Sequence, residues 1–272
     1  MIWLYGKHDV KSAICATTEA MNSYLVMPDE GPDLISLPNL TFMSWPQHKR
    51  PKFTRRSVGS GFELKLSEGQ YKSLERLLRV FEGVMISLKL HDQWFLAAGT
   101  LIGSVLHHNI IPWDDDVDVC VDLYILYFRR VGPDTAVEVM WESKKYDLKQ
   151  IFPVIYRPFG QHWYPAPRNP VSMLSTYYFP SKRLCVSSPY SHAAEMSVSS
   201  SSLPCSSLFH LHAFVQRCPV SRTGRMWRGL QFCDEHLVDG RGQSIHKIQT
   251  LLNPDETESS YFAAQHASFS CP

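Results

Sequence analysis

The clearest hydrophobic pattern in the chain lies between about residues 68 and 90. Ser67 is followed by Gln70 three residues later, which is the residue pair of a capping box at a helix start. Apolar residues then recur at spacings of three and four, namely Tyr71, Leu74, Leu77, Leu78, Phe81, Val84, Met85 and Leu88. The sequence therefore predicts an amphipathic helix that packs one face against a core.

Short apolar segments follow this helix. Residues 94–98 have the composition of a buried strand and end at Gly99-Thr100. Residues 101–107 predict a short helix, and residues 116–127 are apolar and β-branched enough to form a second strand. This order of helix, strand, glycine turn, helix and strand predicts an α/β or α+β domain.

The remaining parts of the chain have weaker patterns. Residues 1–60 show no sustained periodicity and contain a basic stretch that we interpret as a solvated face. Residues 151–180 are rich in proline and aromatic residues, which predicts an ordered but irregular loop. Residues 197–207 are rich in serine, and beyond residue 220 only one helix, near 246–252, is expected.

Composition narrows the classes of partner. The 272 residues are 44% hydrophobic and carry a formal net charge of +1, so no basic field favours nucleic acid or an anionic membrane. The N-terminal apolar run is short for a signal peptide, and no stretch approaches the roughly 20 apolar residues of a membrane helix. The seven cysteines show no CxxC spacing, which leaves buried thiols and one or two disulfides as open alternatives.

The most unusual feature is an acidic run inside an apolar stretch. Asp114, Asp115, Asp116, Asp118 and Asp122 lie among core-like residues in the segment HHNIIPWDDDVDVCVD. Carboxylates this close together raise one another's pKa unless a cation lies between them. A solvated loop with a helix cap is the ordinary alternative.

Residues two apart on a strand point to the same face, so Asp116 and Asp118 would project together, with Cα atoms roughly 6.6 Å apart. Mg²⁺ takes one or two protein carboxylates and completes its coordination with water and phosphate oxygens. The pair beside a glycine turn therefore favours phosphoryl or nucleotidyl transfer.

The segment FLAAGTLIGSVLHHNIIPWDDDVDV closely resembles the signature of the LicD family, which includes fukutin and fukutin-related protein. A second segment, residues 151–170, is similar to the region that follows this signature, and the resemblance covers roughly 70–195. It implies an α/β (α+β) domain with a nucleotidyltransferase-like fold, a small mixed sheet flanked by helices. The expected organisation is a loosely ordered lead-in at 1–60, this domain at 61–195, and a Ser-rich, weakly structured tail at 196–272.

The resemblance also implies an activity. Family members move a phospho-alcohol, such as phosphocholine or ribitol phosphate, from a CDP-linked donor to a glycan hydroxyl, using Mg²⁺ or Mn²⁺. It implies Asp116 and Asp118 as metal ligands and Asp114 and Asp115 as supporting or ligand carboxylates. Gly99, Thr100 and Gly103 would contact the donor phosphate. The animal members imply the Golgi, although the chain shows no signal peptide or membrane anchor.

Four further residues are candidates for binding phosphate. His107 and His108 follow the short helix, where a helix C-terminal charge is an equally good reading. Arg157 and Arg168 could clamp phosphate as planar forks, with surface solvation as the alternative.

A third metal carboxylate is not evident. On one strand Asp122 would lie roughly 13 Å beyond Asp118, too far to share a cation. The interval 119–151 is also short for the family, as if an internal piece were missing. The alternative hypothesis is therefore a catalytically impaired relative that acts as a glycan- or protein-binding scaffold.

Overall fold

A computed structural model describes residues 61–91, 93–121, 128–130, 135–138, 145–151, 154–177, 184–192, 195–219, 226–227, 230–252 and 268–271. The expected lead-in at 1–60 and Asp122 lie outside these residues. The helices are α2 (Glu68–Ser87), α3 (Ala98–His107), α4 (Leu148–Ile151), α5 (Pro170–Tyr177) and the 3₁₀ helix η2 (Cys205–Leu208).

The strands of the first half are short: β1 (Trp94–Leu96), β2 (Val119–Val121), β3 (Phe128–Arg130), β4 (Thr135–Glu138), β5 (Lys145–Asp147), β6 (Ile155–Phe159) and β7 (His162–Ala166). Those of the second half are β8 (Leu184–Val186), β9 (Tyr190–Ser191), β10 (Met196–Ser197), β11 (Ser202–Pro204), β12 (Phe214–Pro219), β13 (Met226–Trp227), β14 (Leu230–Val238) and β15 (Ser244–Leu252). The α+β class is confirmed.

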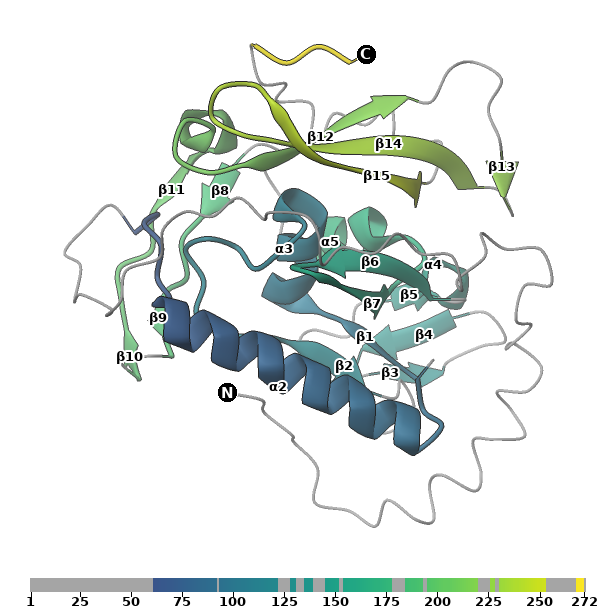
Figure 1. The fold of residues 1–272 in the computed structure, drawn as a ribbon. Coiled ribbons are helices and arrows are strands. Elements are labelled where there is room, and N and C mark those ends of the chain that lie inside the picture. Colours follow the sequence, from purple (N-terminus) through teal and green to yellow (C-terminus); the bar gives the residue numbers. More distant parts are fainter. Residues whose placement is uncertain are drawn as a thin grey trace.

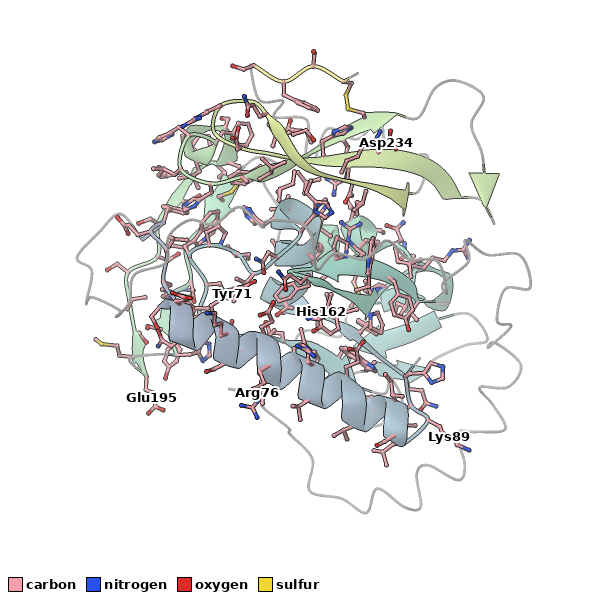
Figure 2. All side chains as sticks on the ribbon, in the orientation of Figure 1. Tyr71, Arg76, Lys89, His162, Glu195 and Asp234 are labelled. Carbon is pink, nitrogen blue, oxygen red and sulfur yellow. A yellow bond between two sulfur atoms is a disulfide. The ribbon has the colours of Figure 1, made fainter. Side chains whose placement is uncertain are left out.

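Helix α2 forms where the apolar periodicity predicted it. The Ser67 side chain accepts a hydrogen bond from the Gln70 N–H, and the Gln70 side chain accepts one from the Ser67 N–H, which completes the capping box. Leu78 and Met85 are buried on the inner face. Arg76 extends from the helix into solvent, and so does Lys89 just beyond its C-terminal end (Figure 2). The predicted amphipathic helix is therefore confirmed.

The elements are stacked in layers (Figure 1). The sheet of β12 to β15 covers α3, and α3 contacts β12, β6 and α5. Strand β1 contacts β7 of the β6–β7 hairpin, and α2 runs beneath these strands. All strand pairings among the described residues are antiparallel, whereas the family resemblance implied a mixed sheet.

Strands β1 and β2 hold the two ends of the acidic segment together. They pair antiparallel with Phe95 opposite Cys120 and Leu96 opposite Val119. Trp94, Leu96, Leu101 and Val105 belong to the main hydrophobic cluster, which α2 covers with Leu78 and Met85. Burial of these side chains is the main contribution to the stability of this region.

The second half of the chain holds more regular structure than the sequence predicted. Residues that we expected to form a weakly structured tail include β12, β14 and β15, which pair side by side in one antiparallel sheet. The helix expected near 246–252 is wrong, because these residues belong to β15. The alternation of a strand is hidden there because buried positions carry polar side chains, namely Gln216, Glu235, His236 and His246.

Two disulfides tie the second half together. Cys185 of β8 is bonded to Cys205 of η2, and Cys218 of β12 is bonded to Cys271. Cys120 and Cys233 are buried free thiols. In the ranges that the structure describes, no helix combines the length and apolar character needed to cross a membrane.

Candidate functional site

The acidic loop, residues 114–118, connects α3 to β2. Its first residue, Asp114, closes a turn in which its N–H donates to the Ile111 carbonyl. Strand β2 begins only at Val119, so Asp116 and Asp118 lie before it and not within it. The predicted strand start at residue 116 is therefore wrong, because the backbone of Asp118 bonds to Ala97 and Thr100 at the start of α3 and not along a β ladder.

Asp118 is the residue that attaches the loop to the start of α3. Its N–H donates to Thr100 Oγ1 at 2.6 Å, and its carbonyl accepts from the Ala97 N–H at 3.1 Å. Its carboxylate accepts a hydrogen bond from the Gly99 N–H. Thr100, which the resemblance assigned to the donor phosphate, thus holds the acidic loop in place.

Gly99 is where two carboxylates converge. A Cβ atom at Gly99 would lie 2.8 Å from Asp114 Oδ2 and 3.6 Å from Asp118 Oδ2. The first distance is shorter than side chains tolerate, so only glycine lets Asp114 approach the start of α3 this closely. The neighbouring Ala98 has φ = 42°, a left-handed conformation that is costly for alanine. Backbone strain of this kind clusters at functional sites.

The two converging carboxylates have strongly perturbed pKa values. Burial and the charge of Asp116 raise the pKa of Asp114 to about 8, and the same two causes raise the pKa of Asp118 to about 7. Two neighbouring acids that resist ionisation near neutral pH indicate a place where a cation would be stabilised.

Asp115 and Asp116 have partners of their own. Asp115 is buried; its Oδ1 lies 3.3 Å from Lys65 Nζ, and its Oδ2 accepts from Ser191 Oγ at 3.1 Å. Asp116 Oδ2 lies 2.8 Å from His192 Nε2. Through these contacts with Lys65 and Ser191, Asp115 anchors the acidic loop, and its role as a supporting or ligand carboxylate stays a prediction.

The donor chemistry fits a hard divalent cation. Asp114, Asp116 and Asp118 offer only carboxylate oxygens, and the approach of Asp114 and Asp118 over Gly99 places two of them together. Across the described ranges, no group of three or more His, Cys, Asp or Glu side chains is already arranged to hold a metal ion. An open site of this kind suits Mg²⁺ or Mn²⁺, which takes one or two carboxylates together with water and substrate phosphate.

Gly103 has a packing role. A Cβ atom there would lie 2.4 Å from the Asn109 carbonyl oxygen and 2.9 Å from the Ile111 nitrogen. The chain segment after α3 therefore packs directly on the helix at Gly103. The expectation that Gly103 contacts phosphate does not fit this arrangement, because backbone atoms of residues 109–111 cover the helix surface at Gly103.

The histidines predicted to bind phosphate lie at the opposite end of α3 from the acidic loop. The helix has ten residues, so its ends are about 15 Å apart. His107 is buried with Nδ1 2.8 Å from the Ala213 carbonyl, and His108 is fully buried. Neither reaches the start of α3, and this part of the prediction does not hold.

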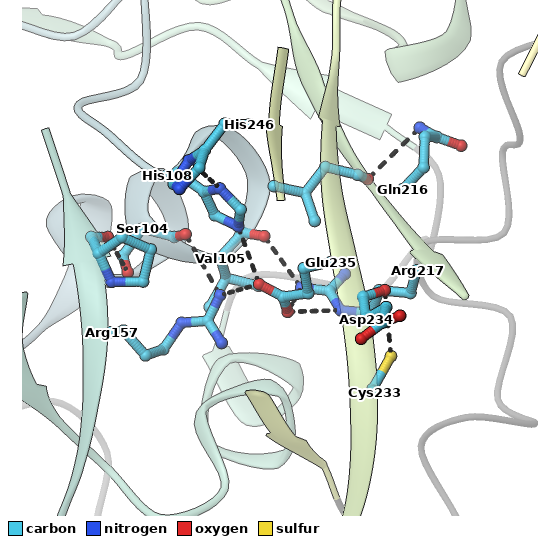
Figure 3. A network of polar contacts seen from close by, with 12 residues as sticks. Ser104, Val105, His108, Arg157, Gln216, Arg217, Cys233, Asp234, Glu235 and His246 are labelled. Carbon is cyan, nitrogen blue, oxygen red and sulfur yellow. Dashed lines mark hydrogen bonds and ion pairs between the residues drawn. The ribbon is translucent and has the colours of Figure 1, made fainter. Parts of the chain in front are cut away.

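Arg157 is likewise buried in a cluster of charges around Glu235, which we call the Glu235 cluster (Figure 3). Arg157 Nη2 lies 2.8 Å from Glu235 Oε2, and Arg217 Nη2 lies 2.8 Å from Oε1. His108 Nε2 lies 2.9 Å from Oε2, and His108 Nδ1 lies 3.0 Å from His246 Nδ1. The predicted phosphate clamp by Arg157 is therefore wrong, because both partners of its Nη2 group, Glu235 and the Ser104 carbonyl, are internal.

The charge of Glu235 is stabilised by the cations around it. Burial alone would raise the pKa of Glu235, but Arg157, Arg217 and His108 hold it well below its ordinary value. Burial lowers the pKa of His108 and brings that of His246 to about 3. Arg217 also donates to the Val105 carbonyl at 2.9 Å, so the cluster joins the C-terminal sheet to the end of α3.

Sequence reasoning missed several residues of both sites. Lys65, Ser191 and His192 contact the acidic loop from segments 50 to 76 positions away, and no short motif marks them. Glu235 and Arg217 were hidden in a region without a clear pattern. Arg168, the other predicted clamp, follows β7, and its N–H donates to the Ile151 carbonyl at 3.0 Å, which places it beside α4.

A scan of protein families found a match to the part of the chain that contains the acidic loop. Residues 91–127 match the family described as LicD/FKTN/FKRP, nucleotidyltransferase domain. The matched residues include β1, α3, the acidic loop and β2, and the match confirms the resemblance to the LicD family. The LicD domain marks a family of phosphotransferase-like enzymes that modify glycans, with a nucleotide-linked donor and a glycan acceptor in general terms. A search of curated proteins found no match to the chain.

Proposed function

We propose that this protein is a divalent-metal-dependent transferase of substituted phosphate groups that moves a phospho-alcohol from a CDP-linked donor to a glycan hydroxyl. The observation that carries the proposal is the convergence of the Asp114 and Asp118 carboxylates over Gly99, inside the segment that matches the LicD domain. Phosphocholine-like and ribitol-phosphate-like groups are the cargo classes that the family suggests.

In this proposal Asp114, Asp116 and Asp118 hold Mg²⁺ or Mn²⁺. When bound, the cation neutralises charge on the donor diphosphate and makes the leaving nucleotide a better leaving group. Thr100 and the Gly99 N–H keep Asp118 at the start of α3, so its carboxylate stays oriented without reorganisation. The absence of a side chain at Gly99 lets the Asp114 carboxylate lie beside that of Asp118, where both would bind the cation.

A second candidate is the catalytically impaired scaffold. It is favoured by the lack, in the described residues, of any cluster of three or more potential ligands already placed for a metal ion. The third carboxylate expected of the fold remains unassigned, because Asp122 lies outside the described residues. Such a protein would keep the fold and bind a glycan or protein without turnover.

Calorimetric titration separates the two candidates. We expect CDP to bind in the presence of Mn²⁺ and to bind weakly without it. Asp116→Asn and Asp118→Asn should each abolish the metal-dependent part, whereas Asp234→Asn, on a partly exposed ion pair with Lys247, should leave it unchanged. Absence of metal-dependent CDP binding in folded wild-type protein would favour the scaffold.

The cellular location is a further part of the proposal. Two disulfides are compatible with folding in an oxidising compartment, as expected for an enzyme that modifies glycans in the secretory pathway. Localisation to the Golgi follows only from the animal members of the family. Non-reducing peptide mapping of protein isolated from cells would test the two bonds.

A further inference from the structure

We infer that His192 is a positioning residue of the acidic loop and that it orients the Asp116 carboxylate for a divalent cation, an inference that rests on the proposed metal-dependent function. His192 lies outside the segment that matches the LicD domain. It belongs to a connection between two short strands, β9 and β10, more than 70 residues from Asp116 in the chain.

The contact between the two side chains is short and partly shielded. His192 Nε2 lies 2.8 Å from Asp116 Oδ2, and the side chains are 27% and 18% exposed. The Tyr190 ring meets the His192 ring edge to face, with centroids 5.0 Å apart. Tyr190 thus limits the rotation of the imidazole, so that Nε2 remains directed at the carboxylate.

The backbone around His192 is held at several independent points. Ser191 is buried and donates to Asp115 Oδ2, while the Tyr190 carbonyl accepts from Lys65 Nζ at 3.2 Å. Lys65 Nζ also reaches Asp115 Oδ1, so one lysine bridges the acidic loop and the segment 190–192. Because three successive residues contact this small assembly, the position of His192 is fixed relative to the loop.

The attachment continues into β8. The Trp113 indole N–H, next to the acidic loop, donates to the Val186 carbonyl at 3.2 Å. Cys185, one residue earlier, is bonded to Cys205, and β8 pairs with β11. The segment 190–192 therefore extends from a cross-linked part of the fold and is not a free surface loop.

His192 engages Oδ2 of Asp116, so in the proposed function Oδ1 is the oxygen that would bind the cation. A carboxylate that coordinates a metal is commonly oriented by such a second hydrogen bond, and loss of that bond costs about 10- to 100-fold in metal affinity. Asp116 differs in this respect from Asp118, whose carboxylate is oriented by the Gly99 N–H. Each of the two acids thus has its own orienting donor, one from α3 and one from the β9–β10 connection.

The test is a titration of the full chain with Mn²⁺ in the absence of the CDP-linked donor. Binding is measured from the electron paramagnetic resonance signal of free Mn²⁺. We expect His192→Ala to weaken binding about 10- to 100-fold. His192→Gln should restore most of the affinity, because the glutamine amide N–H₂ replaces the Nε2–H donor. His210→Ala, an exposed histidine elsewhere in the same half of the chain, is the matched control and should bind as the wild type does.

Equal thermal midpoints of the metal-free wild type and His192→Ala would show that the fold is retained. If the alanine variant does not fold, His192→Phe takes its place, because it keeps a ring beside Tyr190 and lacks the donor, and it should bind Mn²⁺ as weakly. If folded His192→Ala binds Mn²⁺ with the same affinity as the wild type, the positioning role is overturned and the proposed function still stands. A wild type that binds no Mn²⁺ would overturn the metal-dependent function itself, and the positioning role with it.

Discussion

The Glu235 cluster and the acidic loop both place carboxylates in the protein interior, but they neutralise them differently. Glu235 receives two arginines and a histidine, and these hold its pKa well below the ordinary value. In the acidic loop, Asp114 and Asp118 face each other and Asp116, and the pKa of Asp114 is raised to about 8. Among the described residues, Lys65 lies on Asp115 and the His192 imidazole on Asp116, the two neighbouring acids.

The difference separates a structural ion cluster from a site. A buried charge with its partners supplied by the fold contributes to the arrangement of elements, here the sheet of β12 to β15 on α3. Buried carboxylates that the fold leaves without a counter-charge destabilise the protein until a cation arrives, which is the expected state of a binding site. The predictions below test this contrast.

The largest effect is expected at Glu235. Glu235→Ala would leave Arg157, which is fully buried, without its carboxylate partner. Loss of one partner of a buried ion pair costs about 3–5 kcal/mol of unfolding free energy. Asp234→Asn, next to it on β14, should cost less than about 1 kcal/mol, because its pair with Lys247 is partly exposed. Urea unfolding of both variants measures the difference, and equal losses would contradict the contrast.

Removal of the Cys185–Cys205 disulfide is expected to have the next largest effect. The two cysteines are 20 residues apart, and opening a loop of this size costs roughly 3 kcal/mol. If this bond supports the segment 190–192, the Cys185→Ser/Cys205→Ser variant that remains folded should also bind Mn²⁺ more weakly. Thermal unfolding and Mn²⁺ titration of this variant are the measurements. An unchanged metal affinity would show that β8 and η2 support the fold without supporting the site.

Within the acidic loop, Asp114→Asn and Asp115→Asn should have opposite effects on metal-free protein. Asp114→Asn removes an acid that is costly to ionise, and it should stabilise the protein at pH 8 by on the order of 1 kcal/mol. Asp115→Asn weakens the contacts with Lys65 and Ser191 and should destabilise it. Denaturant unfolding at pH 8 without divalent metal distinguishes them. Destabilisation by both variants would mean that Asp114 is a structural residue.

The pH dependence of the unfolding free energy should also distinguish the acidic loop from the Glu235 cluster. The change per pH unit should be smaller than the effects of the substitutions above. Because the pKa of Asp114 is raised to about 8, metal-free protein should lose stability as the pH rises between about 6.5 and 8. Saturating Mn²⁺ should remove this slope, since the carboxylates are then ionised. Below about pH 6.5 the lowered pKa values of His108 and His246 act in the other direction and offset the effect of Asp114 and Asp118, so the stability should change less with pH there.

Thermal midpoints across pH 5 to 8, with and without Mn²⁺, test both limbs. Each titrating group contributes at most about 1.4 kcal/mol per pH unit. Asp114→Asn is the control for the loss between pH 6.5 and 8 and should reduce it, leaving the part that comes from Asp118. A metal-free profile that rises from pH 6.5 to 8 in wild type would contradict the raised pKa of the acidic loop.

Local patterns in the sequence predicted the parts of the fold that depend on local interactions. The capping box at Ser67 and the apolar periodicity after it define α2, and the short helix expected at 101–107 is part of α3, which begins earlier, at Ala98. The acidic run was also recognised, because carboxylates among apolar residues are unusual whatever the fold. The class of the domain and the region of the candidate site followed from these features.

Long-range partners were beyond sequence reasoning. His108 and Glu235 are 127 positions apart, so the histidine was read as a phosphate ligand when its partner is a carboxylate on β14. His192 lies in a segment with only weak resemblance to the family. The β-strands of the second half were missed because their buried faces carry polar side chains that balance one another only in three dimensions.

The separation of the residues in the Glu235 cluster also has a consequence for folding during synthesis. His108 and Arg157 leave the ribosome 127 and 78 residues before Glu235 does. At a typical elongation rate of about 5–20 residues per second, Glu235 would be synthesised several seconds after His108 and Arg157, the residues with which it pairs. The C-terminal end of α3 and β6 would therefore reach their final arrangement only after translation of β14.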